Sequence, residues 1–162
     1  MPSDKRVQDT HISARMKVLH GALISIVSAM NRPQNDEKMI EEAGIRLDRA
    51  LFSVLVSIER LGPIGVVELA DRLGRDYTTI SRQVARLESL GLVRRRESAA
   101  DRRVREAIVS AKGKAMTDRI DAARERMAQA IFEDWRNDDI DRFVRLIRKF
   151  ADALDQGPPA AS

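Results

Sequence analysis

The most concentrated charge in this 162-residue sequence lies between Arg94 and Arg105, where six arginines stand beside only two acidic residues, Glu97 and Asp101. This stretch alone carries a net charge of +4, which equals that of the whole chain, so the remainder is close to neutral. Guanidinium groups bind phosphates through paired hydrogen bonds, and a cluster of them on one projecting segment is typical of proteins that bind a nucleic-acid backbone. The alternative is a charged loop that only contacts solvent.

A second set of residues suited to this chemistry lies on a predicted helix over residues 78–88. At about 3.6 residues per turn, Ile80, Val84 and Leu87 fall on one side of this helix, which we expect to face the core. Arginines and small hydroxyl side chains lie on the opposite side and its flanks, and such side chains contact base edges and phosphates in the major groove. This set comprises Arg75, Thr78, Thr79, Ser81, Arg82 and Arg86. Alternatively, Thr79 and Ser81 only cap and pack the helix, and the arginines only contact solvent.

A helix-turn-helix must position these residues. The sequence predicts a first short helix over residues 66–73, a turn over residues 74–77, and then the helix just described, with Asp76 or Thr78 as its N-cap. In this arrangement the second helix presents its polar side outward.

The arginine-rich segment that follows is predicted to form a hairpin, or wing, with Arg102 and Arg103 at its turn. An arginine at such a tip can enter the minor groove, where A·T-rich sequence deepens the negative potential. Asp101 repels phosphate, so we expect it either to fix the orientation of an arginine or to cap the turn.

Amphipathic helices flank this unit, because apolar residues recur every three or four positions. Residues 1–10 are polar and expected to be frayed, and a helix follows over residues 12–30. Pro33 and its polar neighbours interrupt it, and a short helix over residues 36–43 ends at Gly44. Asp48 then caps a helix that runs to about Leu61.

Two further helices are predicted after the wing. Ser110 is the expected N-cap of a long helix that continues through Trp135, and the chain restarts at Asn137 or Asp138. The last helix carries an apolar seam that consists of Ile140, Val144, Ile147, Ala151 and Leu154. Each stripe could pack on its own core, but stripes at both ends of the chain favour a homodimer.

We therefore expect a mainly α (α+β) fold, a winged helix-turn-helix with a helical dimerisation region. Residues 1–47 and 114–156 form the dimerisation helices, residues 48–113 form the DNA-binding region, and residues 157–162 form a disordered tail. No apolar run is long enough to span a membrane and no signal peptide is evident, which predicts a cytoplasmic protein.

The sequence argues against an enzyme or a metal protein. It has no cysteine, which excludes disulfides, thiolate metal sites and cysteine-based peroxide sensing. It has two histidines, no HExxH motif, no phosphate-binding glycine loop and no nucleophile elbow. No cofactor is expected.

The central motifs resemble the MarR family of bacterial transcription regulators over residues 48–116. The matching positions are L69-A70-x-x-L73, then T79-I80-S81-R82-x-V84-x-R86-L87-E88-x-x-G91-L92-V93-x-R95, then D101-R102-R103 and S110-x-x-G113. The D-x-R at Asp101 and Arg103 is the most diagnostic part.

This resemblance implies a triangular homodimer whose N- and C-terminal helices interleave. It assigns recognition-helix positions to Thr78, Thr79, Ser81, Arg82 and Arg86, a minor-groove role to Arg103 and an orienting role to Asp101. Together with Arg75, Arg95 and Arg102, these residues form the predicted DNA-binding set. Family members commonly repress genes, and many release DNA when a small, often phenolic, anion binds between the dimerisation and DNA-binding regions.

Three positions depart from the family pattern: the break at residues 31–36, a serine instead of threonine at Ser110, and the lack of cysteine. His11, Arg15 and His20 are candidates for contact with a small aromatic or anionic effector, although they could equally be surface or interface residues. The expected function is a ligand-responsive repressor that binds a pseudo-palindromic operator in double-stranded DNA as a homodimer. The alternative is a winged-helix module for protein interaction or for architectural DNA binding without sequence specificity.

Overall fold

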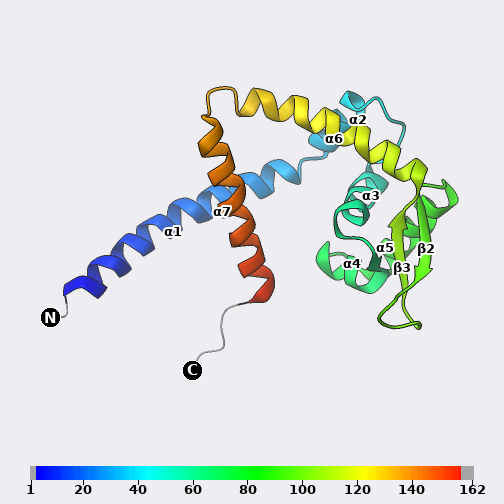
Figure 1. Ribbon diagram of the computed structural model, residues 1–162, viewed down its shortest axis with the longest axis horizontal. Helices are drawn as coiled ribbons and strands as arrows, with labels where there is room; N and C mark the ends of the chain where they lie inside the picture. Colours follow the sequence, from blue (N-terminus) through cyan, green and yellow to red (C-terminus); the bar gives the residue numbers. More distant parts are fainter. Residues whose placement is uncertain (1–2, 158–162) are drawn as a thin grey trace. The chain divides into compact units, whose positions relative to one another are not determined.

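The computed structural model describes residues 3–157, with side chains from Ser13 onward. The elements in chain order are α1 (Ser3–Met30), α2 (Pro33–Glu42), α3 (Arg49–Leu61), β1 (Ile64–Gly65), α4 (Val66–Arg72), α5 (Tyr77–Ser89), β2 (Val93–Glu97), β3 (Arg105–Val109), α6 (Ala111–Ile131) and α7 (Asn137–Gln156) (Figure 1). The chain forms two compact units, divided within α6 between Ala122 and Ala123. The mainly helical fold with a small antiparallel sheet is the one expected from the sequence.

The core of the first unit lies between α3, the helix-turn-helix and the sheet. The predicted inward residues of α3 are all buried, and so are those of α5, where Ile80, Val84 and Leu87 have no exposed surface. Asp48 caps α3 as expected, since its Oδ1 accepts a hydrogen bond from the Ala50 backbone N–H at 2.7 Å. This packing fixes which side of α5 faces outward.

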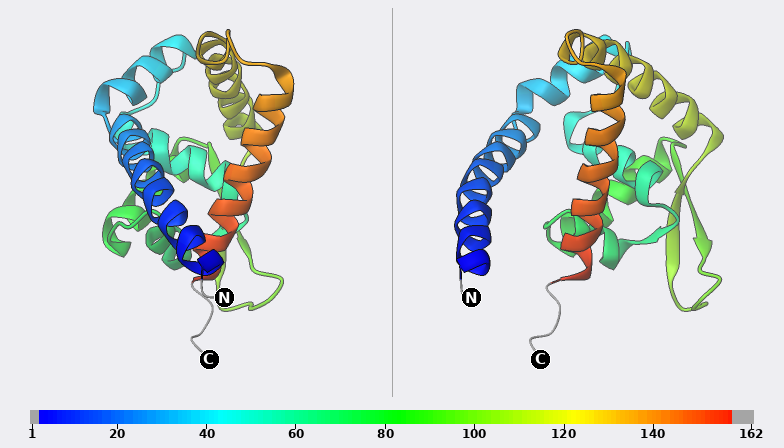
Figure 2. Two further views of the ribbon diagram at one scale, coloured as in Figure 1. Left: turned by 90° about the vertical axis from the view of Figure 1, so that its left-hand side faces the viewer. Right: turned by 60° about the vertical axis from the view of Figure 1, so that its left-hand side comes forward.

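The sheet has the strand order β1-β3-β2, and both pairs are antiparallel. Strands β2 and β3 form the predicted wing, with Arg95 opposite Ala107 and Glu97 opposite Arg105. Figure 2 shows this hairpin with its connecting loop at the end away from α6. The two-residue strand β1, which pairs with β3 through Ile64 and Gly65, was not predicted from the sequence.

The start of α6 is fixed by a close contact with the chain before the wing. The Ser110 hydroxyl caps the helix by accepting a hydrogen bond from the Gly113 N–H at 3.0 Å, and it donates one to the Gly91 carbonyl at 2.5 Å. A Cβ on Gly113 would lie 2.0 Å from the Leu92 carbonyl oxygen, so only glycine fits there. The S-x-x-G motif therefore ties α6 to the end of the helix-turn-helix.

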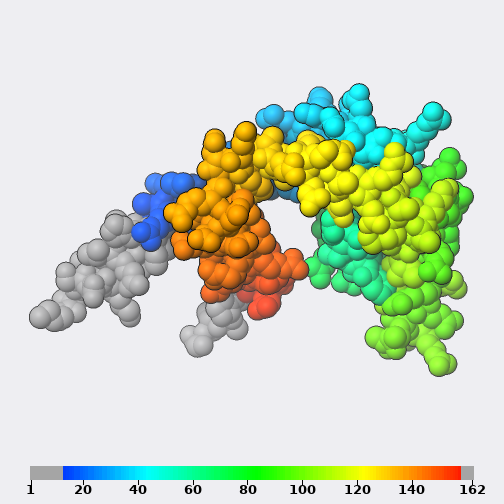
Figure 3. All heavy atoms as spheres, turned by 45° about the horizontal axis from the view of Figure 1, so that its top comes forward, coloured from blue at the N-terminus to red at the C-terminus, as the bar shows by residue number. Residues whose placement is uncertain are grey.

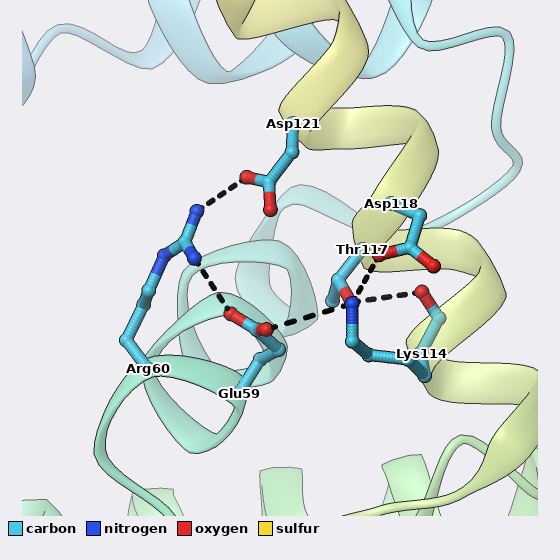
Figure 4. A network of polar contacts seen from close by, with 6 residues as sticks. All are labelled: Glu59, Arg60, Lys114, Thr117, Asp118 and Asp121. Carbon is cyan, nitrogen blue, oxygen red and sulfur yellow. Dashed lines mark hydrogen bonds and ion pairs between the residues drawn. The ribbon is translucent and has the colours of Figure 1, made fainter.

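A polar network further along also joins α3 to α6 (Figure 4). Arg60 contacts both Glu59, at 3.2 Å, and Asp121. Lys114 forms an ion pair with Asp118 and lies 3.9 Å from Glu59. The hydrogen bond from Lys114 to Asp118 raises the pKa of the lysine. These contacts hold the N-terminal part of α6 against α3 within the first unit.

Several predicted boundaries were wrong. Helix α1 begins at Ser3, so helix covers most of the N-terminal segment that we expected to be frayed. The interruption after α1 is limited to Asn31 and Arg32, because Pro33 occupies the first turn of α2, where its missing N–H is tolerated. Helix α6 ends at Ile131 rather than reaching Trp135. Residues 158–162 of the predicted tail lie outside the described residues.

The second unit contains the end of α6 and the whole of α7. Trp135 contacts Phe132 and Phe143 edge to face, with ring centroids 5.1 and 5.6 Å apart. Helix α7 has no buried residue in the single chain, and its predicted seam includes Val144, which is 56% exposed, and Leu154, which is 64% exposed. The apolar side of α7 therefore has nothing in this unit that buries it.

Candidate nucleic-acid interface

The N-terminus of α5 is set by Asp76, one of the two predicted caps. Its side chain accepts a hydrogen bond from the Thr79 N–H at 2.8 Å, while Thr78 lies inside the helix. This hydrogen bond lowers the pKa of Asp76 below its usual range. Gly74, with φ of +58°, supplies the left-handed residue of the turn before the helix.

The outward side of α5 carries the predicted polar set. Thr78, Arg82 and Arg86 are exposed, whereas Thr79 and Ser81 are only partly exposed. Because Ile80, Val84 and Leu87 are buried on the other side, the exposed residues have a fixed direction. Two arginines and a hydroxyl on one side of an exposed helix have the reach and the hydrogen-bonding groups that base edges in the major groove require.

Arg75, in the turn before α5, lies toward α3. Its Nη1 donates a hydrogen bond to the Ser53 hydroxyl at 3.2 Å. Burial raises the pKa of Asp36, at the start of α2, while the charges of Arg49 and Arg75 act in the opposite direction. Arg75 therefore contacts its own protein, and its predicted role at DNA stays a prediction.

The tip of the wing brings Asp101 and Arg103 together as the sequence predicted. Both Asp101 oxygens accept hydrogen bonds from the Arg103 guanidinium at 3.1 Å, and Oδ1 also accepts one from the Arg103 backbone N–H at 3.0 Å. These bonds lower the pKa of Asp101. Asp101 therefore both caps the turn and orients the Arg103 side chain.

Arg103 remains available to a partner despite this contact, since its side chain is 91% exposed. Arg102 beside it is exposed as well. The loop that carries them projects beyond the neighbouring elements of its unit in the space-filling view (Figure 3). A guanidinium held at such a tip can enter a groove that the bulk of the protein cannot.

Arg95, on β2, is turned inward rather than toward the tip. Its Nε lies 3.2 Å from a carboxylate oxygen of Glu88 on α5, and its side chain is only 24% exposed. The contact joins the wing to the end of α5, so the pair helps to fix the angle between these two elements.

A surface hollow of about 450 Å³ lies beside α5 and involves a residue that the sequence analysis missed. Arg82 and Arg86 line it from α5, and Arg46 lines it from the loop between α2 and α3. Arg46 is 36 positions away from Arg82 in the sequence and belongs to no motif. Only the packing of α3 on α5 could have revealed this contact.

The candidate effector residues lie on α1. Arg15 and His20 are exposed, and the His11 side chain lies outside the described residues. Arg15 borders an open, largely apolar hollow with Ala14, Val18, Leu19 and Ala22, but His20 does not line it. The structure therefore brings only one of these three residues to a hollow.

The part of the chain that the structure describes offers neither a metal site nor a membrane-spanning helix. No group of three or more histidine, cysteine, aspartate or glutamate side chains there could hold a metal ion. No helix among those residues is long and apolar enough to cross a membrane.

Comparison with known proteins agrees with this geometry. Residues 47–104 match the model of the MarR family. The Bacillus subtilis protein YxaD, described as an uncharacterized HTH-type transcriptional regulator, is 27% identical over 108 residues, which cover 67% of this chain and 76% of YxaD. YwoH, another such regulator of Bacillus subtilis, is 26% identical over 61% of this chain and 72% of its own length. These relatives are regulators rather than enzymes, as expected.

Solved structures show the same fold. A MarR family protein from Bacillus stearothermophilus superposes with a TM-score of 0.68, at 20% identity over 88% of this chain and 97% of the other. The crystal structure of MarR superposes with a TM-score of 0.59, at 25% identity over 85% and 98% of the two chains. The chain is therefore similar to the MarR family over residues 47–104, and it shares the winged helix-turn-helix fold of these solved structures.

Proposed function

We propose that this protein is a transcription regulator that binds a specific sequence in double-stranded DNA. The observation that carries the proposal is that α5 and the wing, both exposed, belong to the same compact unit. Helix α5 offers Thr78, Arg82 and Arg86 to a major groove. The wing offers Arg103, oriented by Asp101, to an adjacent minor groove.

The proposed regulator acts as a homodimer. Helix α7 buries none of its residues in the single chain, and its exposed apolar residues include Phe143, Val144 and Ile147. α1 also exposes apolar residues, among them Val18 and Val27. An exposed apolar helix side of this kind usually marks an interaction site, and a second copy of the chain is the partner that the family resemblance implies.

A two-fold symmetric dimer places constraints on its DNA. Two copies of α5 would enter successive major grooves about 34–36 Å apart, so the operator should be a pseudo-palindrome with half-sites about one helical turn apart. The minor groove under each wing should be A·T-rich, because narrowing there favours an inserted arginine.

The proposed output is repression that is relieved by a small aromatic or anionic effector, as in many members of the family. Arg15 supports this part of the proposal, since it provides a positive charge beside the open apolar hollow on α1. An effector can weaken DNA binding only if it binds the released conformation of the dimer more tightly than the DNA-bound conformation.

Selection of genomic fragments with the purified full-length protein tests the proposed function. We expect enrichment of one pseudo-palindromic motif, with half-sites centred about one helical turn apart. If the recovered fragments share no motif and all lose binding equally as salt rises, the protein is a non-specific DNA binder. If no fragment is retained at all, the winged helix serves another kind of partner.

A further inference from the structure

The hollow beside α5 has three arginines and one aspartate in its lining, so its net charge is positive. Arg46, Arg82 and Arg86 line it, and their guanidinium groups make no hydrogen bond or ion pair within the described part of the chain. Some other arginines of the unit do have an acidic partner, as Arg95 has in Glu88. Asp48 offsets only part of this charge, so an anion between the three guanidinium groups would reduce the repulsion among them.

Gln83, which also lines the hollow, has a side-chain atom without a hydrogen-bond partner. Gln83 lines it between the two arginines of α5, and the Gln83 amide oxygen is buried with no hydrogen-bond partner. A buried polar group without a partner costs free energy, so rotation of the Gln83 side chain toward a ligand in the hollow would be favourable. An amide that turns through half a rotation presents its NH2 instead and then donates to an anionic oxygen.

The shape of the hollow favours a chain-like ligand over an enclosed small molecule. Its charged rim is exposed, whereas Leu47 and Leu90 are half-buried and Leu51 is buried beneath it. A site that binds a free small molecule usually surrounds most of that molecule. An anion that is part of a larger ligand, with an apolar neighbour that covers the leucines, fits an open hollow of this kind.

We propose that this hollow takes one phosphate and the adjoining deoxyribose of the DNA backbone, which makes Arg46 a backbone contact outside both the helix-turn-helix and the wing. This inference rests on the proposed function, because it needs α5 to lie in a major groove. The phosphate lies among the three guanidinium groups, and the sugar covers Leu47. Contacts of this kind fix the position of a recognition helix without reading sequence.

One lining residue opposes the phosphate. Asp48 lines the hollow with its carboxylate, which caps α3 through the Ala50 N–H at 2.7 Å. Asparagine caps a helix about as well as aspartate. Asp48→Asn should therefore keep the fold and remove the repelling charge, and it should tighten binding to DNA.

The test is a salt titration of DNA affinity with full-length variants, on a selected fragment and on a scrambled duplex of the same composition. Arg46→Gln should weaken binding several-fold on both duplexes and reduce the slope of log K against log salt by about one per protomer. Arg46→Lys should keep most of the slope, because lysine retains the charge. Arg32→Gln, the same change at an exposed arginine outside the hollow, is the matched control.

The inference is overturned if Arg46→Gln has the slope and affinity of Arg32→Gln, or if Asp48→Asn does not tighten binding. A calorimetric titration of the protein with inorganic phosphate, in the absence of DNA, tests whether the ligand is a free anion. Saturable binding that depends on Arg46, together with an unchanged DNA slope, would assign the hollow to that anion instead. Failure of the proposed function looks different: wild-type protein would then show no preference for the selected fragment, whatever Arg46 does.

Discussion

At the scale of single residues, the tip of the wing is the most closely determined part of the candidate interface. Asp101 holds the Arg103 guanidinium through two hydrogen bonds and holds its backbone through a third. A long side chain loses conformational entropy when it binds, and an arginine that is already oriented loses less. The acidic residue therefore supports binding to an anionic partner although its charge repels that partner.

Arg103→Ala should weaken binding to the selected DNA by about 1–3 kcal/mol, because a groove contact at the wing is lost. Asp101→Asn should weaken it less, since the arginine remains but is no longer held by a charged partner. Fluorescence anisotropy with labelled duplex measures both. Unchanged affinity for Arg103→Ala would remove the wing from the interface.

The contribution of the Asp101–Arg103 pair to DNA affinity should depend little on pH. The hydrogen bonds from Arg103 lower the pKa of Asp101, so the ion pair is complete above the usual aspartate pKa and is lost only as the pH falls through the lowered value. The difference in DNA affinity between wild type and Asp101→Asn should therefore stay constant between about pH 5 and pH 8. A difference that shrinks within this range would contradict the assigned contact.

Arg82→Ala addresses the major-groove side of the interface. If Arg82 contacts a base edge, its loss should relax the preference at one position of each half-site by about 1–3 kcal/mol. Affinities for a set of duplexes with single base-pair changes measure this preference. A uniform loss of affinity across the whole set would make Arg82 a phosphate contact instead.

Sequence reasoning found the residue contacts that are local and missed those that are not. Asp101 and Arg103 are two positions apart in a turn, so their pairing follows from local geometry. The hydrogen bond from Arg75 to Ser53 depends on how elements distant in the sequence pack together, as does the position of Arg46 and Arg82 around one hollow. No spacing in the sequence encodes such contacts.

At the scale of elements, the start of α6 decides how the wing is anchored. Gly113 lies against the Leu92 carbonyl, and Ser110 connects the first turn of α6 to Gly91. The sequence predicted the cap from Ser110. It could not predict the close approach, which depends on the distance between two backbones.

Gly113→Ala should destabilise the protein by about 1–3 kcal/mol, because the added methyl group would overlap the Leu92 carbonyl unless α6 shifts. Thermal unfolding measures this loss. Ser110→Thr is a useful comparison, since it keeps the capping hydroxyl and should cost less. A Gly113→Ala protein as stable as wild type would mean that α6 moves freely against the helix-turn-helix.

Strand β1 is the one element in the described residues that the sequence did not predict. Its two residues, Ile64 and Gly65, form a strand only because β3 lies beside them, more than forty positions later in the chain. Two residues are too few for an alternating pattern. The longer helices were predicted correctly because periodicity over several turns is a strong signal, whereas their ends were less certain.

At the scale of the whole molecule, the central question is what covers α7. A helix of 20 residues with one apolar side and no buried residue is incomplete as a single chain. The seam was evident from its spacing. The surface that packs against this seam was not evident, since a single sequence does not distinguish an interface between two copies of the chain from a core within one copy.

Ile147→Glu should weaken the proposed dimer on the order of 100-fold, because an unpaired charge would be buried in an apolar contact. Lys149→Glu, at an exposed position on the opposite side of α7, is the matched control and should leave the dimer intact. Sedimentation equilibrium measures both. Equal dissociation constants for the two variants would place the interface elsewhere.

The most direct test of sequence-specific binding compares two affinities of the wild-type protein at one fixed salt concentration. One is for the operator selected from genomic fragments, and the other is for a scrambled duplex of equal length and composition. We predict that the operator binds at least about 1,000-fold more tightly. Equal affinities for the two duplexes would contradict the account and leave only a winged helix that binds DNA through its charge.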